Sequence, residues 1–244
     1  MQTIKSNPDL QQKLVSILTS KNTSLRNSFP DNILDFHSDI FPLRIREMFP
    51  GYSHYLLELG SGWGDFCLEY ARQNPETLCI ALDKKKYRIK KSAKEQFAAG
   101  IKNIRWLVCH FDWKFENLFL PDSFDKIIIN FPDPWPKKRH QKNRFIRPDF
   151  VKELALIARS GSGLNGSQNF GQGFYKKSGE LEFATDNWKY MEDALQDFLD
   201  SHCWENIHGE NVVLPFLANR PASFFEILKR QEKENIYFIQ LGKK

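Results

Sequence analysis

Residues 55–65 read Tyr55-Leu-Leu-Glu58-Leu-Gly60-Ser-Gly62-Trp-Gly64-Asp65. A short apolar run of strand type passes into a turn with glycine at every second position, and a helical pattern begins at Asp65. Glycine lets the backbone turn tightly and come close to a ligand, as in the first strand-to-helix turn of a nucleotide-binding sheet. This stretch therefore predicts an α/β protein with a ligand site at the turn.

The glycine spacing distinguishes between two kinds of ligand. A dinucleotide-binding turn has the pattern G-x-G-x-x-G, whereas here Gly60, Gly62 and Gly64 alternate and Glu58 stands two residues before them. A carboxylate is a poor neighbour for a pyrophosphate but suits a positively charged amino group. S-adenosylmethionine carries such a group and no phosphate, so the pattern favours this cofactor, contacted by Glu58, Gly60 and Gly62, over a nicotinamide dinucleotide.

Strand patterns recur along the chain and alternate with helical patterns, at residues 78–83, 104–109, 124–129, 180–185 and 236–241. This alternation predicts a doubly wound, Rossmann-like α/β sheet, mostly parallel, with helices on both faces and a late antiparallel strand. Asp83 ends the second strand about 20 residues beyond the glycines, where an acid accepts hydrogen bonds from ribose hydroxyls or caps the next helix.

Three local predictions concern the helices. The helix after Asp83 carries Ile89, Ala93 and Phe97 at four-residue spacing, which predicts its buried face. Asp186 is expected to cap the helix that follows the strand 180–185, and residues 201–220 are expected to be irregular.

The main domain is predicted to span residues 51–244, after a helical appendage formed by residues 1–50. The tract 160–178 is rich in glycine and serine and cannot bury much apolar surface, so it is predicted to be a flexible surface insertion. The four cysteines have no metal-type spacing, which predicts no metal site and a reduced compartment. No signal peptide and no apolar run of membrane-spanning length occurs, so we expect a cytoplasmic protein without membrane contact.

A second motif spans residues 130–147 and reads Asn-Phe-Pro-Asp-Pro-Trp-Pro-Lys-Lys-Arg-His-Gln-Lys-Asn-Arg-Phe-Ile-Arg. Its alternating prolines are expected to hold the backbone extended. A stiff acidic loop at the carboxyl end of a buried strand is where an α/β enzyme keeps its chemistry. The basic run that follows, residues 137–147, suits a polyanionic substrate. The alternative is a surface loop with solubilising charge.

The net charge of +5 matters because the basic residues cluster. Residues 84–91 form a second group, which either contacts nucleic acid or is a solvated helix face.

Four motifs together resemble the tRNA (guanine-N7)-methyltransferases, over roughly residues 50–241. They are the turn from Glu58 to Gly64, the block from Asn130 to His140, Ala184-Thr-Asp186, and Ser223-Phe-Phe-Glu226. The resemblance implies transfer of a methyl group from S-adenosylmethionine to N7 of the variable-loop guanine, position 46, of tRNA.

The resemblance also implies roles for individual residues. S-adenosylmethionine would be bound by Glu58, Asp83, Asp112 and Asp133, and Asp133 would also be the catalytic residue. The guanosine would be contacted by Lys137, Asp186, Ser223, Phe224, Phe225 and Glu226, and the RNA by Arg139, His140, Lys142 and Arg144. This chain has Asp83 where the family usually has glutamate and Ser223 where it usually has threonine.

The chemistry is consistent with these roles. Guanine N7 carries a lone pair and no proton, so methyl transfer needs alignment and no general base. The product is cationic, and the Asp133 carboxylate would stabilise that charge. Trp135 either stacks on the base or belongs to the core. The alternatives are an amino-group methyltransferase, because Asn130-Phe-Pro partly imitates an Asn-Pro-Pro-Tyr loop, and a non-enzymatic RNA-binding protein. The sequence leaves open whether the protein is a monomer or a homodimer.

Overall fold

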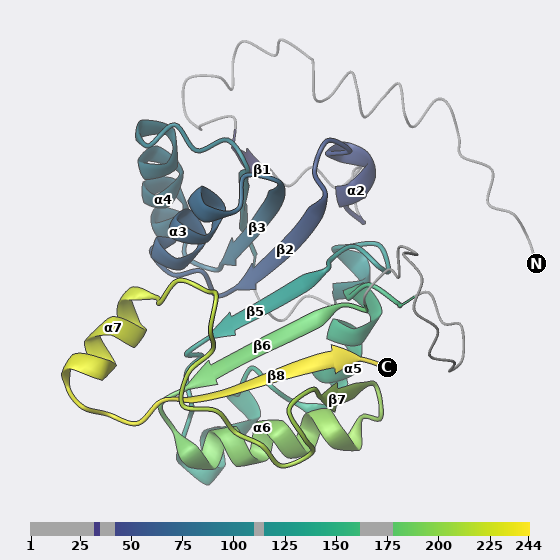
Figure 1. Ribbon diagram of the computed structural model, residues 1–244, viewed down its shortest axis with the longest axis vertical. Helices are drawn as coiled ribbons and strands as arrows, with labels where there is room; N and C mark the ends of the chain where they lie inside the picture. Colours follow the sequence, from purple (N-terminus) through teal and green to yellow (C-terminus); the bar gives the residue numbers. More distant parts are fainter. Residues whose placement is uncertain (1–31, 35–41, 110–114, 162–177) are drawn as a thin grey trace, which may run out of the picture.

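The computed structural model describes residues 32–34, 42–109, 115–161 and 178–244. Its described strands form one eight-stranded sheet (Figure 1). The strands are β1 (Ile33–Leu34), β2 (His54–Leu59), β3 (Thr77–Asp83), β4 (Ile104–Val108), β5 (Lys126–Asn130), β6 (Glu180–Thr185), β7 (Trp204–Asn206) and β8 (Tyr237–Lys243). The α-helices are α2 (Ile45–Met48), α3 (Asp65–Gln73), α4 (Lys86–Ala98), α5 (Pro148–Ile157), α6 (Trp188–Asp200) and α7 (Phe224–Gln231). Two 3₁₀ turns, η2 (Phe115–Asn117) and η3 (Lys138–Asn143), complete the order.

The sheet order is β1-β4-β3-β2-β5-β6-β8-β7. Strands β1 to β6 pair in parallel, whereas β8 runs antiparallel to both β6 and β7. The chain winds outward through β3 and β4 on one side of β2 and through β5 and β6 on the other. The order thus reverses between β2 and β5, and ligands bind open α/β sheets beside the carboxyl ends of the strands at such a point. The predicted fold is confirmed.

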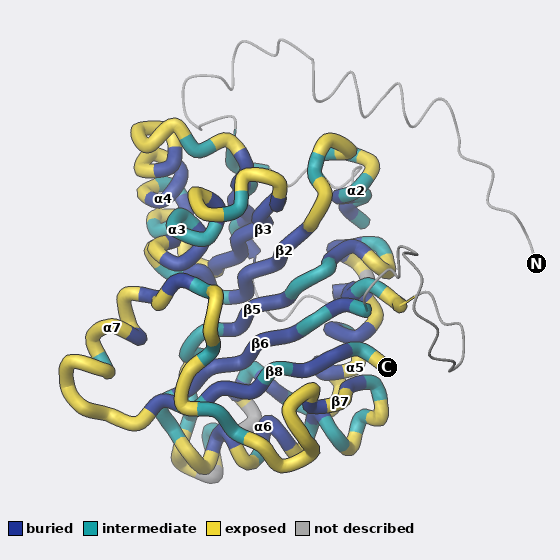
Figure 2. The backbone as a smooth tube through the Cα atoms, in the orientation of Figure 1, coloured by how far each residue is buried: buried dark blue, intermediate teal, exposed yellow. Residues whose placement is uncertain are grey.

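Helices cover both faces of the sheet because alternate side chains of each strand point to opposite faces. On β2, Leu57 and Leu59 belong to the larger core, which includes residues of α2, α5 and α6. Leu56 belongs to a second core with residues of α3 and α4. In Figure 2 the central strands are buried along most of their length, while α7 is largely exposed.

The buried face of α4 differs from the prediction. Phe97 is 82% exposed, whereas Ser92 and Gln96 are buried. Gln96 accepts a hydrogen bond from the Trp106 indole at 2.6 Å and donates to the carbonyls of Ile101 and Ile104. A buried amide with all these partners is tolerated in a core, and no sequence periodicity reveals such partners.

Residues 201–220 are not wholly irregular, as had been expected. They contain β7, which pairs only with β8 in the described sheet and is too short to give an alternating pattern. The cap of α6 is Asn187, one residue beyond the predicted Asp186, and its side chain accepts a hydrogen bond from the Tyr190 amide at 2.9 Å.

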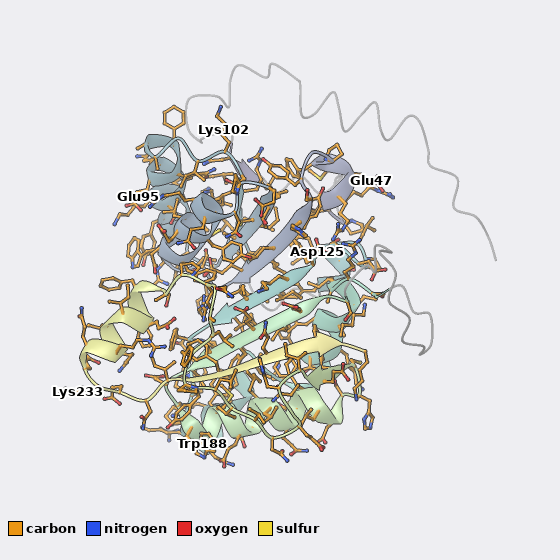
Figure 3. The ribbon with its side chains drawn as sticks, in the orientation of Figure 1. Glu47, Glu95, Lys102, Asp125, Trp188 and Lys233 are labelled. Carbon is orange, nitrogen blue, oxygen red and sulfur yellow. The ribbon has the colours of Figure 1, made fainter. Side chains whose placement is uncertain are left out.

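Asp125 ties together the edge of the sheet that lies opposite the strands' carboxyl ends (Figure 3). Its carboxylate accepts a hydrogen bond from the Tyr55 amide at 2.9 Å. It also pairs with Arg46 at 2.8 Å and with Arg159 at 2.5 Å. These contacts join β2, α2 and the segment after α5. They stabilise the register of β2 and β5 at the amino ends of these strands, opposite the carboxyl ends where ligands bind.

The described part of residues 1–50 contributes to the sheet and the core, through β1 and through the buried Leu43 and Ile45. Most of the predicted appendage and residues 162–177 of the insertion lie outside the described residues, so the division of the chain at residue 50 stays a prediction. None of the described helices is long and apolar enough to span a membrane. No cluster of three or more metal-ligating side chains occurs within the described ranges.

Candidate active site

A cleft of about 440 Å³ opens at the carboxyl edge of the sheet, where the strand order reverses. It brings together the ends of β2 and β3, the start of α4 and the loop after β5. Its lining includes Leu59, Gly60, Asp83, Lys84, Arg88, Asn130, Phe131, Pro132, Asp133, Trp135, Asn143, Arg144, Phe145, Arg147 and Phe150. The two motifs that the sequence singled out, far apart in the chain, therefore meet at one cleft.

The glycine turn has left-handed backbone angles at Gly60, Gly62 and Gly64, with φ of 78°, 57° and 79°. A side chain at Gly64 would also collide with its surroundings, because its Cβ would lie 2.5 Å from the Trp106 ring. The Asp83 carboxylate fastens this turn: it accepts hydrogen bonds from the Gly62 amide at 3.0 Å and from the Lys85 amide at 2.7 Å. Asp83 thus holds the glycine turn, although the residue that caps α4 is Lys85.

Glu58 is only 2% exposed and is not among the residues that line the cleft, but it adjoins Leu59 and faces Asn130, which both line it. Its Oε1 is 3.4 Å from the Asn130 amide nitrogen, and its Oε2 accepts no hydrogen bond from the described residues. Burial raises the pKa of Glu58 to about 8, and the nearby Asp65 carboxylate adds to this effect. A buried carboxylate with an unused oxygen fits a ligand that brings a positive charge and hydrogen-bond donors.

Asp133 lines the cleft and is exposed. The backbone of its loop was predicted to be extended, but it is not extended throughout. Phe131 and Trp135 have φ of 48° and 41°, in the left-handed region. Proline fixes only its own φ, so the residues between the prolines stay free to turn. Each of these two strained residues, on either side of Asp133, destabilises the folded protein by about 1–3 kcal/mol. Such strain is typical of functional loops.

Arg144 lines the cleft and is at the same time held within the protein, so its predicted contact with RNA stays a prediction. Its side chain is buried, and its guanidinium donates to the Pro134 carbonyl at 2.8 Å and to the Asp193 carboxylate at 2.6 Å. It also stacks over the Tyr190 ring, 4.9 Å from the centroid. Arg144 therefore holds the Asp133 loop against α6.

Other members of the basic run lie nearer the surface. Lys137 and Arg139 are exposed, and the half-buried His140 accepts a hydrogen bond from Arg139 Nε at 3.2 Å. His140 also contacts the Trp135 ring edge-on, with centroids 5.8 Å apart. The predicted site residue Asp112 and the Lys142 side chain lie outside the described residues.

The segment Ser223–Glu226 begins α7, beside the cleft. Ser223 is buried and caps the helix by accepting a hydrogen bond from the Glu226 amide at 3.2 Å. Glu226 is also buried and accepts two hydrogen bonds from Arg230. Phe225 reaches the cleft wall, with its ring 4.9 Å from that of Phe131, while Phe224 is exposed.

Two further contacts fix α7 in place. The Phe224 amide donates a hydrogen bond to Asp65, the first residue of α3. Asp186 pairs with Lys229 of α7 at 3.5 Å. Four of the six predicted guanosine contacts, Ser223 to Glu226, thus form one segment, which is held to Asp65 at the start of α3 and, through α7, to Asp186 after β6.

Sequence reasoning missed Arg220, which lies behind the cleft and links Asn130 to the start of α7. The sequence did contain one sign of Arg220. Arg220-Pro221 stands just before the Ser223 motif, in a stretch without a clear helical or strand pattern.

The residues present fit S-adenosylmethionine. Glu58 offers an unused buried oxygen for the amino group, and Gly60 of the glycine turn lines the cleft. Asp83 keeps lone pairs for ribose hydroxyls, since each carboxylate oxygen can accept more than one hydrogen bond. The cofactor would supply a methyl group activated by its positive sulfonium.

Comparison with solved structures shows the same fold. An aminoglycoside resistance methyltransferase, NpmB1, matches 86% of this chain and 95% of its own with a TM-score of 0.56 at 15% identity. The 16S rRNA (adenine(1408)-N(1))-methyltransferase from Catenulisporales acidiphilia gives a TM-score of 0.56 at 15% identity, covering 86% of this chain and 94% of its own. These likenesses show that the chain shares the fold of these solved methyltransferases.

Comparison of sequences identifies the family. A family model described as a putative methyltransferase matches residues 53–165. The tRNA (guanine-N(7)-)-methyltransferase of Leptospira interrogans serovar Lai is 32% identical over 240 residues, which are 95% of each chain. The protein of the same name from Chlamydia pneumoniae is 29% identical over 82% of this chain and 80% of its own. With that identity and coverage, the chain belongs to the tRNA (guanine-N7)-methyltransferase family.

Proposed function

We propose that this protein transfers a methyl group from S-adenosylmethionine to N7 of a guanine in tRNA. By the family resemblance, the target is the variable-loop guanine at position 46. The observation that carries the proposal is that one cleft is lined both by the glycine turn with Asp83 and by the Asp133 loop. A methyl donor held at the first and a purine held at the second would meet in that cleft.

The site supports this reaction without a general base, because N7 has a lone pair and no proton to lose. Holding the two reactants in line can supply about 7–11 kcal/mol of the barrier. Asp133 stabilises the positive charge that develops on the purine, and its loop is fixed by Arg144 at the Pro134 carbonyl. Glu58, Gly60, Gly62 and Asp83 hold the cofactor, and Phe225 with Lys137 and Asp186 borders the guanosine.

The amino-group methyltransferase is the weaker alternative. In such enzymes the asparagine of the loop must offer its side chain to an exocyclic amine. Here the Asn130 side chain is used within the protein, with its oxygen accepting from Arg220 at 2.7 Å and its nitrogen facing Glu58. Asn130 therefore acts in support of the cofactor carboxylate.

The atom that accepts the methyl group can be tested directly. A tRNA transcript with 7-deazaguanine at position 46 has a carbon in place of N7 and therefore no lone pair there. It should bind with the affinity of the unmodified transcript and accept no methyl group. Nucleoside analysis after incubation with labelled S-adenosylmethionine checks this, and methylation of the altered base would refute N7 as the target.

The basic run yields a second prediction, based on two arginines with opposite surroundings. Arg139→Gln should lower the slope of log affinity for tRNA against log salt by about 0.7–0.9, because an exposed arginine on a phosphate releases counterions. Arg144→Gln should leave that slope unchanged, because its charge is used on Pro134 and Asp193. It should instead cost roughly 1–3 kcal/mol of stability, because the Pro134 carbonyl loses its donor and Asp193 loses one of its two cations.

Titrations of tRNA at several salt concentrations, together with thermal melts, separate the two arginines. An unchanged slope for Arg139→Gln would exclude Arg139 from the RNA surface. A reduced slope for Arg144→Gln would support the RNA contact predicted for Arg144.

The proposal extends to organisation and location. The partner is tRNA, contacted by Arg139, His140 and Lys142, and the protein acts in the cytoplasm, where tRNA is modified. Residues 51–244 carry the activity and residues 1–50 are appended to them. Light scattering of the purified chain distinguishes a monomer from a homodimer.

A further inference from the structure

Arg220 is a buried cation in the segment between β7 and α7. Its side chain is 4% exposed and its guanidinium lies between two aromatic rings, 4.9 Å from the Phe66 centroid and 5.2 Å from the Phe238 centroid. Burying a charge is costly unless it is paired and hydrogen-bonded. The partners of Arg220 therefore indicate what the residue does.

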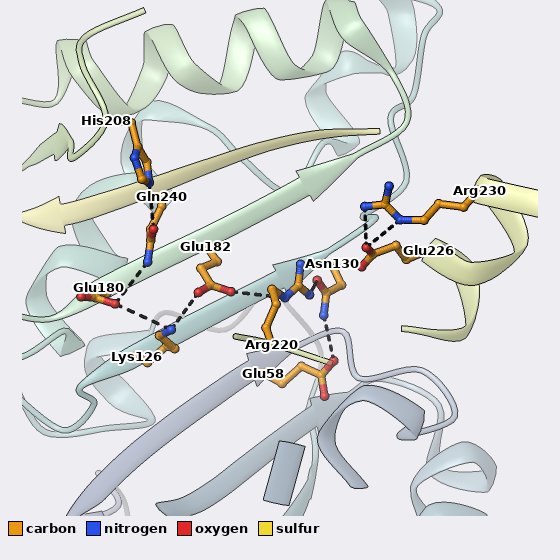
Figure 4. Close-up of polar contacts among 10 residues, drawn as sticks. All are labelled: Glu58, Lys126, Asn130, Glu180, Glu182, His208, Arg220, Glu226, Arg230 and Gln240. Carbon is orange, nitrogen blue, oxygen red and sulfur yellow. Dashed lines mark hydrogen bonds and ion pairs between the residues drawn. The ribbon is translucent and has the colours of Figure 1, made fainter. Parts of the chain in front are cut away.

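On the cofactor side, Arg220 sets the orientation of Asn130 (Figure 4). Its Nη2 donates to the Asn130 amide at 2.7 Å. A guanidinium only donates hydrogen bonds, so the oxygen of that amide must face Arg220. The amide nitrogen is thereby directed to Glu58 Oε1, 3.4 Å away. Arg220 thus acts on the cofactor carboxylate through one intervening side chain.

On the guanosine side, Arg220 reaches the first turn of α7. Its Nη1 is 3.8 Å from Glu226 Oε2, while Arg230 holds the other oxygen of Glu226 at 2.8 Å. Its Nε is 3.5 Å from Glu182 Oε2 on β6. Glu182 is itself paired with Lys126 at 2.7 Å, so the cluster continues into the sheet.

The cluster is incompletely bonded. Glu58, Glu182 and Glu226 each have one buried oxygen without a hydrogen bond from the described residues, and Nε and Nη1 of Arg220 likewise have none. The 3.5 and 3.8 Å separations lie beyond ordinary hydrogen-bond length. A small movement of the guanidinium would convert these ion pairs into hydrogen bonds, so the cluster can respond to a charge brought to Glu58.

We propose that Arg220 is a positioning residue that couples cofactor binding to guanosine binding, through Asn130 on one side and Glu226 on the other. This inference rests on the proposed function and deepens it. An ammonium group bound at Glu58 fixes the orientation of the Glu58 carboxylate and of the Asn130 amide that faces it. Because Arg220 contacts both Asn130 and Glu226, a change in the orientation of Asn130 moves the guanidinium relative to Glu226 at the start of α7. Each ligand therefore strengthens the binding of the other by the same factor, and such factors are typically about 5–150-fold.

The coupling is measured with two ligands that bind together without reacting. S-adenosylhomocysteine keeps the amino group but has no methyl group to transfer, and tRNA with 7-deazaguanine at position 46 accepts none. Calorimetry gives the dissociation constant of S-adenosylhomocysteine with and without saturating tRNA. In the parent protein the ratio of the two constants should be about 5 or more. In Arg220→Gln it should fall to about 1.

A control ligand and a control variant separate coupling from general damage. 5′-Methylthioadenosine lacks the amino-acid portion and cannot reach Glu58, so its affinity should be the same in the parent and in Arg220→Gln. Arg230→Gln removes the more exposed cation from the same Glu226 and should keep the parent ratio. Arg220→Lys should not restore the coupling, because one ammonium cannot span Asn130 and Glu226 together.

Asn130→Ala provides the same test if Arg220→Gln fails to fold. It breaks the link on the cofactor side and leaves Arg220 with Glu182 and Glu226, so the ratio should again fall to about 1.

A parent ratio of 1, or a folded Arg220→Gln protein with the parent ratio, would overturn the role of Arg220. If the parent forms N7-methylguanosine in tRNA while either result is seen, only this inference fails. If the parent forms no N7-methylguanosine in tRNA, the proposed function fails as well.

Discussion

Asp133→Ala should lower the rate constant for methylation of tRNA by about 10²–10³-fold, the usual effect of removing one group that stabilises charge in a transition state. The Asp133 carboxylate lines the cleft, and the reaction places a positive charge on the purine. Asp133→Asn should lose nearly as much, because the amide keeps the size and an acceptor oxygen but not the charge. Single-turnover transfer of labelled methyl groups measures both rate constants.

A nearby acid supplies the control for this prediction. Asp149 in the first turn of α5 is exposed and is not among the residues that line the cleft, so Asp149→Ala should keep the parent rate. Circular dichroism establishes that each variant is folded. Turnover near the parent rate by folded Asp133→Ala would show that the carboxylate takes no part in the chemistry.

Glu58→Gln should produce opposite effects on binding and on stability. Losing one partner of a buried charge pair costs about 2–5 kcal/mol, which at pH 8 and above corresponds to roughly a 30- to 4,000-fold weaker affinity for S-adenosylmethionine. The parent affinity should rise as the pH approaches 8, because burial raises the pKa of Glu58 to about 8 and only the ionised form pairs with the ammonium. In Glu58→Gln this pH dependence should disappear.

The stability of the protein without ligand should change in the other direction. Between the ordinary pKa of 4.5 and the raised value of about 8, folded Glu58 holds a proton that the unfolded chain releases. The free energy of unfolding therefore falls as the pH rises through this window, by at most about 1.4 kcal/mol per pH unit. Glu58→Gln removes this loss, so it should melt above the parent at pH 8 and close to it near pH 4.5.

Calorimetric titrations and thermal melts from pH 5 to pH 9 test both effects on the same samples. Asn130 and Arg220 lower the pKa of Glu58, whereas Asp65 and Asp83 raise it. The pH range over which stability falls therefore depends on all of these neighbours. A parent protein whose melting temperature rises steadily to pH 8 would contradict the buried, protonated state of Glu58.

The sheet and the glycine turn could be predicted because their signals are local. The apolar run before Gly60, the alternating glycines and the acid at the end of β3 all lie within about 30 neighbouring positions, as in other open sheets of this type. The same holds for Ser223 and Glu226, whose spacing is that of a helix cap.

The residues whose surroundings sequence reasoning could not foresee depend on partners far away in the chain. Arg144 is one of several cations in its run, and only Asp193 and Tyr190 on α6 show that it is buried. Gln96 is polar, yet its hydrogen bonds to Trp106 and the adjoining backbone bury it in place of Phe97. Arg220 donates a hydrogen bond to Asn130, 90 positions upstream, and no local pattern encodes such a pairing.

The position of β8 has a consequence for the order in which the protein can assemble during synthesis. β8 lies between β6 and β7, so β7 is made before the strand that joins it to the sheet. Until residues 237–243 have left the ribosome, the edge of β6 stays open, and exposed edges invite pairing with other chains. A nascent chain of this protein therefore completes its sheet only after β8 has been made, and chaperones that shield strand edges should matter most before that point.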